Sequence, residues 1–547
     1  MQTTKDTLIG RLTEVTGDHF NARLEAEGDD FVAERMFGMH KVRVGQIGSY
    51  MTVKQGDSNI LVMVDRMWRE VDDDHRVQYM VRLSPLGELN ADGDFTRGVN
   101  HYPSTGADLH LVSMWELEKV FSEHSENDYK VGKLSAFEGI DVCLDASAFF
   151  GRHAAILGQS GAGKSWTVTS LIQAALRAMP KAHIILLDMH GEYSDSDEGV
   201  AVKSPFPAGK TRCIKAQDLE FPYWLLRFSE IAELIVDPAD PDASTQTSYM
   251  RSVILRMKRD VNKHLDLGHI TVDSPVFFSM DELVENLRDA NEETSDFGKK
   301  KSPLYGKFDQ LLVRLESLLN DTRYDFLLKP QRRTSTETLT DLMNDFVGLG
   351  EPKANITVLD LSAVPFDVTP MVTAQVGRLA YEFNFWNPNC REFPIYLICE
   401  EAHEYIPRED DPRYREARKA MERIAKNGRK YGVGICVVSQ RPHDVSETVL
   451  AQCSTYICLR ISNPNDQEYV RAMVPDAARD TFSALTSLAK GEAVALGEGV
   501  PMPVRFQVNM PNPPPNSTDI DYAGKWRDGG EAVDVSDLVS RWHKQKR

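Results

Sequence analysis

Short apolar runs alternate with amphipathic segments from about residue 150 onward. Ala154–Leu157 is an apolar run that leads into a Gly-rich loop, and Ile184–Leu187 is a second run that ends at Asp188. Between these runs, apolar residues recur at the spacing of one helix face, at Val168, Leu171, Ile172 and Ala175. Apolar strands that alternate with helices predict an α/β fold with a mainly parallel sheet.

Apolar strand-like runs return in the second half of the chain, at Ile356–Leu361, Ile395–Cys399, Ile435–Ser439 and Tyr456–Ile461. Ala493–Leu496 and Val504–Val508 are predicted to form a final hairpin. The stretch between the two groups of strands has helical spacing, for example at Phe308, Leu312, Leu315 and Leu319. It is therefore predicted to be a helical insertion within the α/β core.

The N-terminal part has the two-residue period of β-strands. Val77, Tyr79, Val81 and Leu83 alternate with polar residues, and Gly-containing breaks separate the short runs. A small barrel is the simplest way to hide the edges of such strands. The region holds no cluster of catalytic residue types, which indicates an assembly or docking domain.

These patterns predict five segments. They are a β-rich domain at 1–130, the first part of the α/β core at 131–224, the helical insertion at 225–345, the second part of the core at 346–510, and a linker with a C-terminal helix at 511–547. The last helix would either pack as an arm on a neighbouring subunit or fray in solvent.

The composition narrows the class of protein. The 547 residues are 41% hydrophobic and 27% charged, which is typical of globular domains. No apolar run reaches the ~18–20 residues that span a bilayer, and the N-terminus lacks a signal-peptide pattern. The seven cysteines include no CxxC pair, so buried thiols are expected rather than disulfides or zinc ligands. We expect a soluble cytoplasmic protein without a membrane segment.

The net charge is −19, which argues against a broad basic coat for duplex DNA. It does not exclude a narrow ring of basic loops inside an oligomer.

The strongest motif follows the first apolar run of the core. It matches G-x-x-x-x-G-K-[ST] between a predicted strand and a predicted helix, and consists of Gly158, Gln159, Ser160, Gly161, Ala162, Gly163, Lys164 and Ser165, with Trp166 directly after it. Such a loop points backbone N–H groups at phosphate oxygens. Lys164 is expected to reach the β- and γ-phosphates of ATP, and Ser165 to ligate Mg²⁺. The motif alone also fits a loop that binds ATP without hydrolysing it.

Two carboxylates end the strand-like run Ile395–Cys399. Glu400 is expected to hold the Mg²⁺ shell, either directly or through water, because it is one methylene longer than the usual Asp. Glu401 is expected to orient or deprotonate the attacking water. The alternative is an exposed charge pair at a strand end.

Two further positions fit phosphoryl-transfer chemistry. Gln440 follows the run Ile435–Ser439 and is expected either to sense the γ-phosphate or to cap the strand. Arg429 is the preferred arginine finger, with Arg423 and Lys430 as substitutes, and a solvated basic helix face as the alternative.

Asp188 ends the second core strand, where ligands of parallel sheets gather. It is expected either to lie near the nucleotide and its water or to cap the following turn. His190 and His403 are single histidines without a partner at metal spacing, so zinc is not expected.

The order of these motifs resembles the HerA branch of the HerA/FtsK family of ring-forming ATPases. The likeness rests on Gly158–Ser165, Asp188 with Gly191-Glu192-Tyr193, Glu400-Glu401-Ala402-His403, Gly428-Arg429-Lys430, Ser439-Gln440-Arg441-Pro442 and Gly491-Glu492-Ala493. Val44–Ser49 and Pro85–Leu89 are similar in style to the HAS-barrel that precedes the ATPase in this family.

The resemblance implies a RecA-like core, a homohexameric ring and an ATP site at each subunit boundary. It also implies a partner effector on the barrel face, either a NurA-like nuclease, a sirtuin-like NAD hydrolase or another nuclease, in DNA processing or antiphage defence. Candidate DNA contacts are Arg413, Arg415 and Arg418, with Lys203, Lys210 and Arg212 as second choices; both groups also fit surface charges paired with nearby acids.

Three functions follow as hypotheses. One is an ATP-driven translocase or helicase that moves along double-stranded DNA for its effector. Another is a scaffold ring that assembles and switches its partner enzyme without moving on DNA. The third is a protein remodeller or a small-molecule kinase, and the long insertion and the N-terminal barrel disfavour a compact kinase.

Overall fold

The chain is described from a computed structural model. It describes residues 7–25, 34–37, 40–56, 58–73, 75–90, 92–122, 124, 128–137, 139–194, 203–295, 300–473, 485–517, 520–529 and 533–543. The chain divides into two compact units. The first unit consists of Met1–Ala182, Tyr396–Asp410 and Glu422–Pro514, and the second of His183–Ile395, Asp411–Met421 and Pro515–Arg547.

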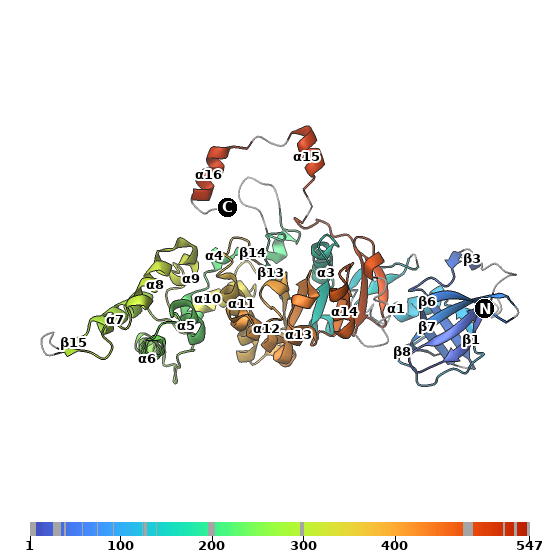
Figure 1. Cartoon of the computed structure of the whole chain (residues 1–547), viewed down its shortest axis with the longest axis horizontal. Helices are drawn as coiled ribbons and strands as arrows, with labels where there is room; N and C mark the ends of the chain where they lie inside the picture. Colours follow the sequence, from blue (N-terminus) through green and yellow to red (C-terminus); the bar gives the residue numbers. More distant parts are fainter. Residues whose placement is uncertain are drawn as a thin grey trace. The chain divides into compact units, whose positions relative to one another are not determined.

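The N-terminal part of the first unit is a closed β-barrel, as predicted (Figure 1). Within the described residues its strands are β1 (Leu8–Val15), β2 (Phe20–Leu24), β5 (Tyr50–Gln55), β6 (Ser58–Val71), β7 (Val77–Leu89) and β9 (Asp108–Leu111). They run in the order β2-β1-β9-β5-β6-β7, and β2 also pairs with β7, so the sheet closes on itself. Phe20, Val62 and Leu109 are among the fully buried side chains inside it. The closure removes the exposed edges that isolated strands would leave.

Shorter elements surround the barrel. Strand β8 (Phe95–Arg97) pairs with β7, and β3 (Glu34–Phe37) forms a hairpin with β4 (His40–Arg43). Helix α1 (Met114–Ser122) follows the last barrel strand.

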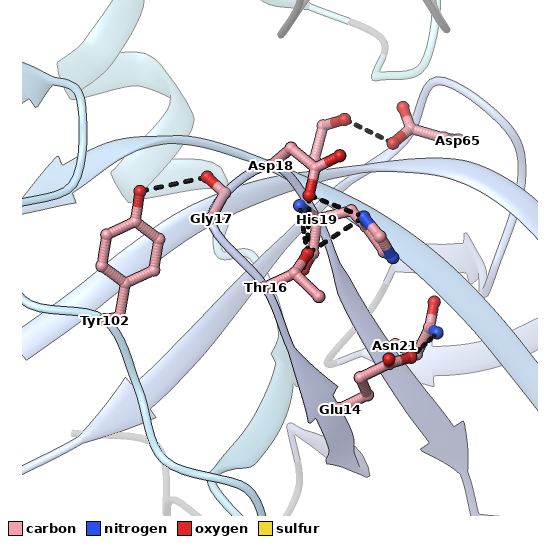
Figure 2. A network of polar contacts seen from close by, with 9 residues as sticks. Glu14, Thr16, Gly17, Asp18, His19, Asn21, Asp65 and Tyr102 are labelled. Atoms are coloured by element: carbon pink, nitrogen blue, oxygen red, sulfur yellow. Dashed lines mark hydrogen bonds and ion pairs between the residues drawn. The ribbon is translucent and has the colours of Figure 1, made fainter.

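The turn between β1 and β2 is held by a local polar network (Figure 2). The Thr16 hydroxyl donates to Asp18 Oδ1 at 2.7 Å and holds the pKa of that carboxyl below its ordinary value. The Tyr102 hydroxyl donates to the Gly17 carbonyl at 3.1 Å, which ties the turn to the segment before β9. Hydrogen bonds within the turn, and one from Tyr102, therefore hold the turn between β1 and β2 in place.

The barrel is also bonded to the α/β part of its own unit. The Arg97 guanidinium donates to the carbonyl oxygens of Gly497 and Pro501, at 2.8 and 3.1 Å. The Tyr50 hydroxyl donates to the Pro503 carbonyl at 2.9 Å. The loop between the last two strands of the core therefore carries the barrel contacts.

The α/β part of the first unit is built on one sheet. Its strands are β10 (Lys130–Leu134), β11 (Asp141–Cys143), β12 (Ala154–Leu157), β18 (Ile395–Cys399), β19 (Val433–Ser439), β20 (Thr455–Cys458), β21 (Glu492–Gly497) and β22 (Val504–Val508). Their order is β11-β10-β22-β21-β20-β12-β19-β18. Strand β12 pairs in parallel with both β19 and β20, whereas β20–β21 and β21–β22 are antiparallel.

The predicted strands of this sheet are confirmed, including the final hairpin. Strand β19 begins at Val433, two residues before the predicted start. The largest error is at β20, which ends at Cys458, whereas the predicted run continues to Ile461. The reason is that the Arg460 carbonyl accepts a hydrogen bond from Gln159 N at 3.0 Å, so the chain there serves the loop after β12.

Helices connect these strands. They are α2 (Ala146–Gly151), α3 (Lys164–Ala178), α13 (Glu447–Leu450), α14 (Pro464–Met473) and the second half of α12 (Arg415–Asn427), whose first half belongs to the second unit. Helix α3 buries most of its length, including Val168, Leu171 and Ala175.

The second unit holds a three-stranded parallel sheet and a group of helices. The strands are β13 (Ile184–Asp188), β14 (Thr211–Lys215) and β17 (Ile356–Asp360), with β17 in the middle. The helices are α4 (Ala216–Leu219), α5 (Phe228–Ile235), α6 (Ala243–Val261), α7 (Met280–Glu292), α8 (Asp309–Asn320), α9 (Asp325–Leu328), α10 (Thr338–Phe346) and α11 (Thr369–Trp386), and β15 (Thr294–Ser295) pairs with β16 (Lys300–Lys301). Most of these helices lie in sequence between β14 and β17, and the mixed α/β fold class is as predicted.

The C-terminal segment contains α15 (Tyr522–Asp528) and α16 (Val535–His543). Their large apolar side chains are exposed, with Trp526 at 81% and Trp542 at 70%. Among the helices of the described residues, none combines the length and the apolar character needed to cross a membrane.

Gly434 of β19 packs closely against Phe150 and Tyr396, and a substitution there tests this packing. A Cβ at Gly434 would clash with the Phe150 carbonyl and come within 2.5 Å of the Tyr396 ring. Overpacking of this kind costs about 1–3 kcal/mol, so Gly434→Ala is expected to lower the free energy of unfolding by that amount. Thermal melting followed by circular dichroism measures it.

Gly151→Ala is the matched control, because a Cβ there would have nothing within 4 Å. Equal melting temperatures for both variants would contradict the packing described for β19.

Candidate functional site

The loop after β12 forms an anion cradle at the N-terminus of α3. Strand β12 is fully buried, and its last residue, Leu157, lies opposite Ser439 of β19 and Cys458 of β20. Gly161 and Gly163 have positive φ angles of 73° and 107°, which are unfavourable for residues that carry a Cβ atom. Backbone N–H groups at a helix start, together with the helix dipole, favour phosphate oxygens.

Neighbouring segments hold the cradle in shape. Gly158 N donates to the Ser439 carbonyl at 3.2 Å, and Gln159 N donates to the Arg460 carbonyl at 3.0 Å. The Gln159 side chain accepts from Ser462 N at 2.9 Å. A Cβ at Gly158 would lie 2.9 Å from Leu459 Cβ, so the loop passes close to the segment after β20.

The turn before β21 supports the other side of the loop. Gly491 N donates to the Ala162 carbonyl at 3.2 Å. Next to it, Glu492 forms a bidentate ion pair with Arg505 at 2.7 and 2.8 Å, and this pair lowers the pKa of the Glu492 carboxyl against the effect of burial. This turn belongs to the Gly491-Glu492-Ala493 motif, whose contact with the loop could not be read from sequence.

Lys164 is the first residue of α3 and is 8% exposed. Its Nζ lies 3.5 Å from the Gln159 carbonyl oxygen, so the ammonium folds back over the loop. Ser165 and Trp166 follow on the first turn and are half-buried.

Two buried carboxylates end β18, the neighbour of β19 in the sheet. Glu400 is 3% exposed, and its backbone carbonyl accepts a hydrogen bond from the Tyr405 hydroxyl at 2.9 Å. Glu401 is 9% exposed and adopts a left-handed φ of 44°. The pair is therefore not an exposed charge pair.

A histidine and a serine lie beside Glu401. His403 belongs to the 3₁₀ turn η7 (Ala402–Glu404), and its Nδ1 lies 3.3 Å from Glu401 Oε2. The same Nδ1 lies 3.4 Å from Ser439 Oγ. Ser439 Oγ also accepts a hydrogen bond from Arg441 N at 3.0 Å, so Gln440 sits, half-buried, in a turn fixed at both ends.

Arg429 lies at the opposite end of β19. It is exposed on the 3₁₀ turn η9 (Gly428–Tyr431), which immediately precedes the strand. Its charge contributes to lowering the pKa of His153 to about 4, after the larger effect of burial. The His153 ring accepts a hydrogen bond from Ile435 N at 3.1 Å. Within one chain, Arg429 thus lies beside the start of β12, away from the cradle at its end.

Asp188 of the second unit acts as a cap for the turn that follows β13. Its two carboxylate oxygens accept hydrogen bonds from the backbone N–H groups of Glu192 and Tyr193, both at 2.9 Å. Burial raises the pKa of this carboxyl to about 6, despite those hydrogen bonds. The capping alternative is observed, and a water-positioning role stays a prediction.

The candidate DNA-contacting arginines lie around the start of α12. Arg413 pairs with Asp411, Nη2 to Oδ2 at 2.6 Å, while Arg415 is exposed and Arg418 half-buried. Among the second choices, Arg212 is engaged with Asp345 at 2.8 Å and with the Gly350 carbonyl. Arg212 is therefore a structural residue of its unit.

The first unit thus brings the Gly158–Ser165 loop, Glu400, Glu401 and Gln440 to one end of neighbouring strands. Sequence patterns missed His403 and Ser439 as members of the site. The only available hint was their position within the two strand-end motifs.

Comparisons with known proteins show which family the chain resembles. The family described as "Helicase HerA, central domain" matches residues 129–379, and "Helicase HerA-like C-terminal" matches residues 397–541. A probable helicase of Methanocaldococcus jannaschii is 27% identical over 529 residues, which cover 91% of this chain and 90% of the relative. The DNA double-strand break repair helicase HerA of Sulfolobus acidocaldarius is 28% identical and covers 82% of each chain.

Solved structures give a weaker likeness. The VirB4 structure of Thermoanaerobacter pseudethanolicus is 18% identical, with a TM-score of 0.47, over 70% of this chain and 96% of that one.

The backbone of the cradle yields a prediction about nucleotide affinity. Gly163→Ala forces a side chain onto a φ of 107°, and strain of about 1–3 kcal/mol is expected, equivalent to an about 5- to 150-fold weaker affinity for ATP. Fluorescence titration with a labelled ATP analogue measures this affinity. Gly209→Ala, at a glycine with free space around it, is the control. Unchanged affinity in the Gly163 variant would contradict the assignment of this loop as the cradle.

Proposed function

The chain belongs to the HerA family, and from this premise we propose that it is an ATP-hydrolysing ring ATPase that moves along double-stranded DNA for a partner effector. The observation that carries the proposal is the meeting of the cradle, Glu401 and the Gln440 turn at one end of β12, β18 and β19. The name of the Sulfolobus relative, a DNA double-strand break repair helicase, supports DNA as the substrate.

The residues divide the work of phosphoryl transfer. The cradle N–H groups and the Lys164 ammonium hold the β- and γ-phosphates and offset the charge that develops on the γ-phosphate. Glu401 accepts the proton of the attacking water, or orients that water, because it is the buried carboxylate beyond the strand end. Gln440 lies at the next strand end, where it would sense the γ-phosphate.

The Ser165 hydroxyl and the Glu400 carboxylate are oxygen ligands of the kind that Mg²⁺ prefers. Ser165 lies on the first turn of α3, and Glu400 directly follows β18. Glu400 is buried, which suits a carboxylate that faces a cation. Bound Mg²⁺ would neutralise charge on the β- and γ-phosphates.

Arg429 fits a neighbour's site better than its own. Strand β19 spans seven residues between the Arg429 turn and Ser439, which corresponds to roughly 20 Å of extended chain. An arginine side chain cannot cover that distance to its own cradle. An exposed arginine at this end suits insertion into the site of an adjacent subunit, and hence a ring, which we expect to be a homohexamer.

The effector, DNA path and ring closure follow the family expectation. We propose that the barrel face binds the effector, which is a nuclease, such as a NurA-like nuclease, or a sirtuin-like NAD hydrolase. The complex would act in DNA processing or antiphage defence. Arg415 and Arg418 remain the preferred DNA contacts, and α16 the segment that braces a neighbour. The exposed Trp542 supports a packing role for α16.

Hydrolysis and DNA movement are tested together by the steady-state ATPase rate with and without long duplex DNA. Glu401→Gln keeps the shape but loses the base, so the rate is expected to fall by about 10²–10⁴-fold while ATP binding persists. Glu404→Gln, on the same turn, is the control and retains the rate. Strong stimulation of the wild type by duplex DNA is expected.

An ATPase that ignores DNA but still binds its partner enzyme would favour the scaffold ring over the translocase. An active Glu401→Gln variant would remove Glu401 from the mechanism.

The shared site is tested by mixing variants. Arg429→Ala and Lys164→Ala are each expected to be inactive, since an arginine finger contributes about 10³–10⁵ in rate. Mixed under conditions that exchange subunits, the two should regain part of the activity, because some boundaries then combine an intact cradle with an intact arginine. Lys426→Ala is the control for Arg429→Ala, and this variant is expected to be active without mixing. No recovery despite proven exchange would count against a trans arginine.

A further inference from the structure

His403 occupies the space between the candidate base and the neighbouring strand end. Its Nδ1 lies 3.3 Å from Glu401 Oε2 and 3.4 Å from Ser439 Oγ. The side chains of His403 and Glu401 are each 11% exposed, so water screens this contact little. A nearly buried contact of this geometry is well placed to hold the Glu401 carboxylate in one position.

One nitrogen faces two oxygen partners. A neutral imidazole has one N–H group, so Nδ1 either carries that hydrogen and donates a hydrogen bond or lacks it and accepts one. If Nδ1 carries the hydrogen, it can donate to the Glu401 carboxylate. If Nδ1 lacks it, the Ser439 hydroxyl can donate to Nδ1, and the Glu401 carboxylate then faces a second acceptor. The hydrogen bond with Ser439 and the ion-pair contact with Glu401 therefore compete for Nδ1.

The backbone at Glu401 leaves the strand in a sharp turn. Its φ of 44° is uncommon for a residue with a side chain, and it turns the chain sharply out of β18 into the η7 turn. After that turn, β18 no longer directs the carboxylate. His403 lies two residues further along the same turn, and its contact with the carboxylate at 3.3 Å can fix the direction of that group.

Ser439 links this contact to the rest of the site. Its backbone carbonyl accepts from Gly158 N at 3.2 Å, and its hydroxyl accepts from Arg441 N at 3.0 Å. A change in the turn that carries Gln440 therefore moves a hydroxyl that competes for His403. The route runs from the Gln440 turn through Ser439 and His403 to the Glu401 carboxylate.

We propose that His403 is the positioning residue for Glu401 and that Ser439 couples this position to the Gln440 turn. The inference rests on the proposed role of Glu401 in ATP hydrolysis. In one arrangement His403 holds the carboxylate, and in the other Ser439 takes the imidazole nitrogen and releases the carboxylate toward the water.

Steady-state ATPase kinetics of His403→Ala in the full-length protein test the proposal. Loss of a residue that orients a reacting group is expected to lower kcat by about 10- to 100-fold. The KM for ATP is expected to change by less than about threefold. His443→Ala is the matched control, because His443 lies on the exposed turn nearby and contacts Asp444. A kcat equal to that of the wild type would overturn the proposal.

The two amide variants separate positioning from filling of space. The amide nitrogen of His403→Asn can occupy the place of Nδ1, whereas that of His403→Gln reaches toward the place of Nε2. Partial recovery of kcat is expected for the Asn variant and not for the Gln variant. Equal kcat values in the two variants would overturn the proposal, and this comparison still decides the matter if the alanine variant does not fold.

The coupling through Ser439 is tested by a double-mutant cycle. If both residues act along one route, His403→Ala combined with Ser439→Ala should have the same kcat as His403→Ala alone. Independent, multiplying losses would overturn the coupling. Glu401→Gln separates the two proposals: if that variant hydrolyses ATP normally, the role of Glu401 fails, whereas an inactive Glu401→Gln beside a normal His403→Ala defeats only the role of His403.

Discussion

The parallel pairing of β12 with β19 and β20 is the constraint on which the site depends. Leu157 lies opposite both Ser439 and Cys458, so the three strands end at the same level. Loops that leave the sheet at one level can exchange backbone hydrogen bonds without being long. Gly158 N donates to the Ser439 carbonyl and Gln159 N to the Arg460 carbonyl. The register therefore shapes the cradle as much as its glycines do, and a slip of one residue would separate these partners.

Several charged side chains at this edge of the sheet are buried from solvent. Lys164, Glu400 and Glu401 are each less than 10% exposed, and burying a charge is costly unless a partner compensates for it. The structure provides such partners locally: Lys164 lies over the Gln159 carbonyl, and Glu401 faces His403. Groups that are already oriented and desolvated need little reorganisation when charge develops on a phosphate. The arrangement is thus preorganised for phosphoryl transfer.

Local patterns were sufficient where neighbours in sequence determine the structure. The strand–loop–helix from Ala154 to the end of α3 follows from an apolar run, three glycines and an amphipathic face, and the barrel follows from two-residue alternation. Contacts between distant segments could not be predicted in this way. His403 and Ser439 are 36 positions apart, and the pairing of β18 with β19 brings the turn after β18 next to Ser439. At Asp188 the sequence allowed two roles, and the burial of β13 with its N–H donors shows the capping role.

Strand β19 connects both ends of the proposed mechanism. At one end Ser439 contacts the cradle and the His403 imidazole, and at the other Arg429 leaves the sheet into solvent. The strand between them is fully buried, so it is a rigid spacer rather than a flexible link. If Arg429 enters the site of a neighbour, one rigid strand touches two ATP sites. A shift of β19 caused by events at its own cradle would then reach the next subunit directly, which offers a physical route for sequential firing around a ring.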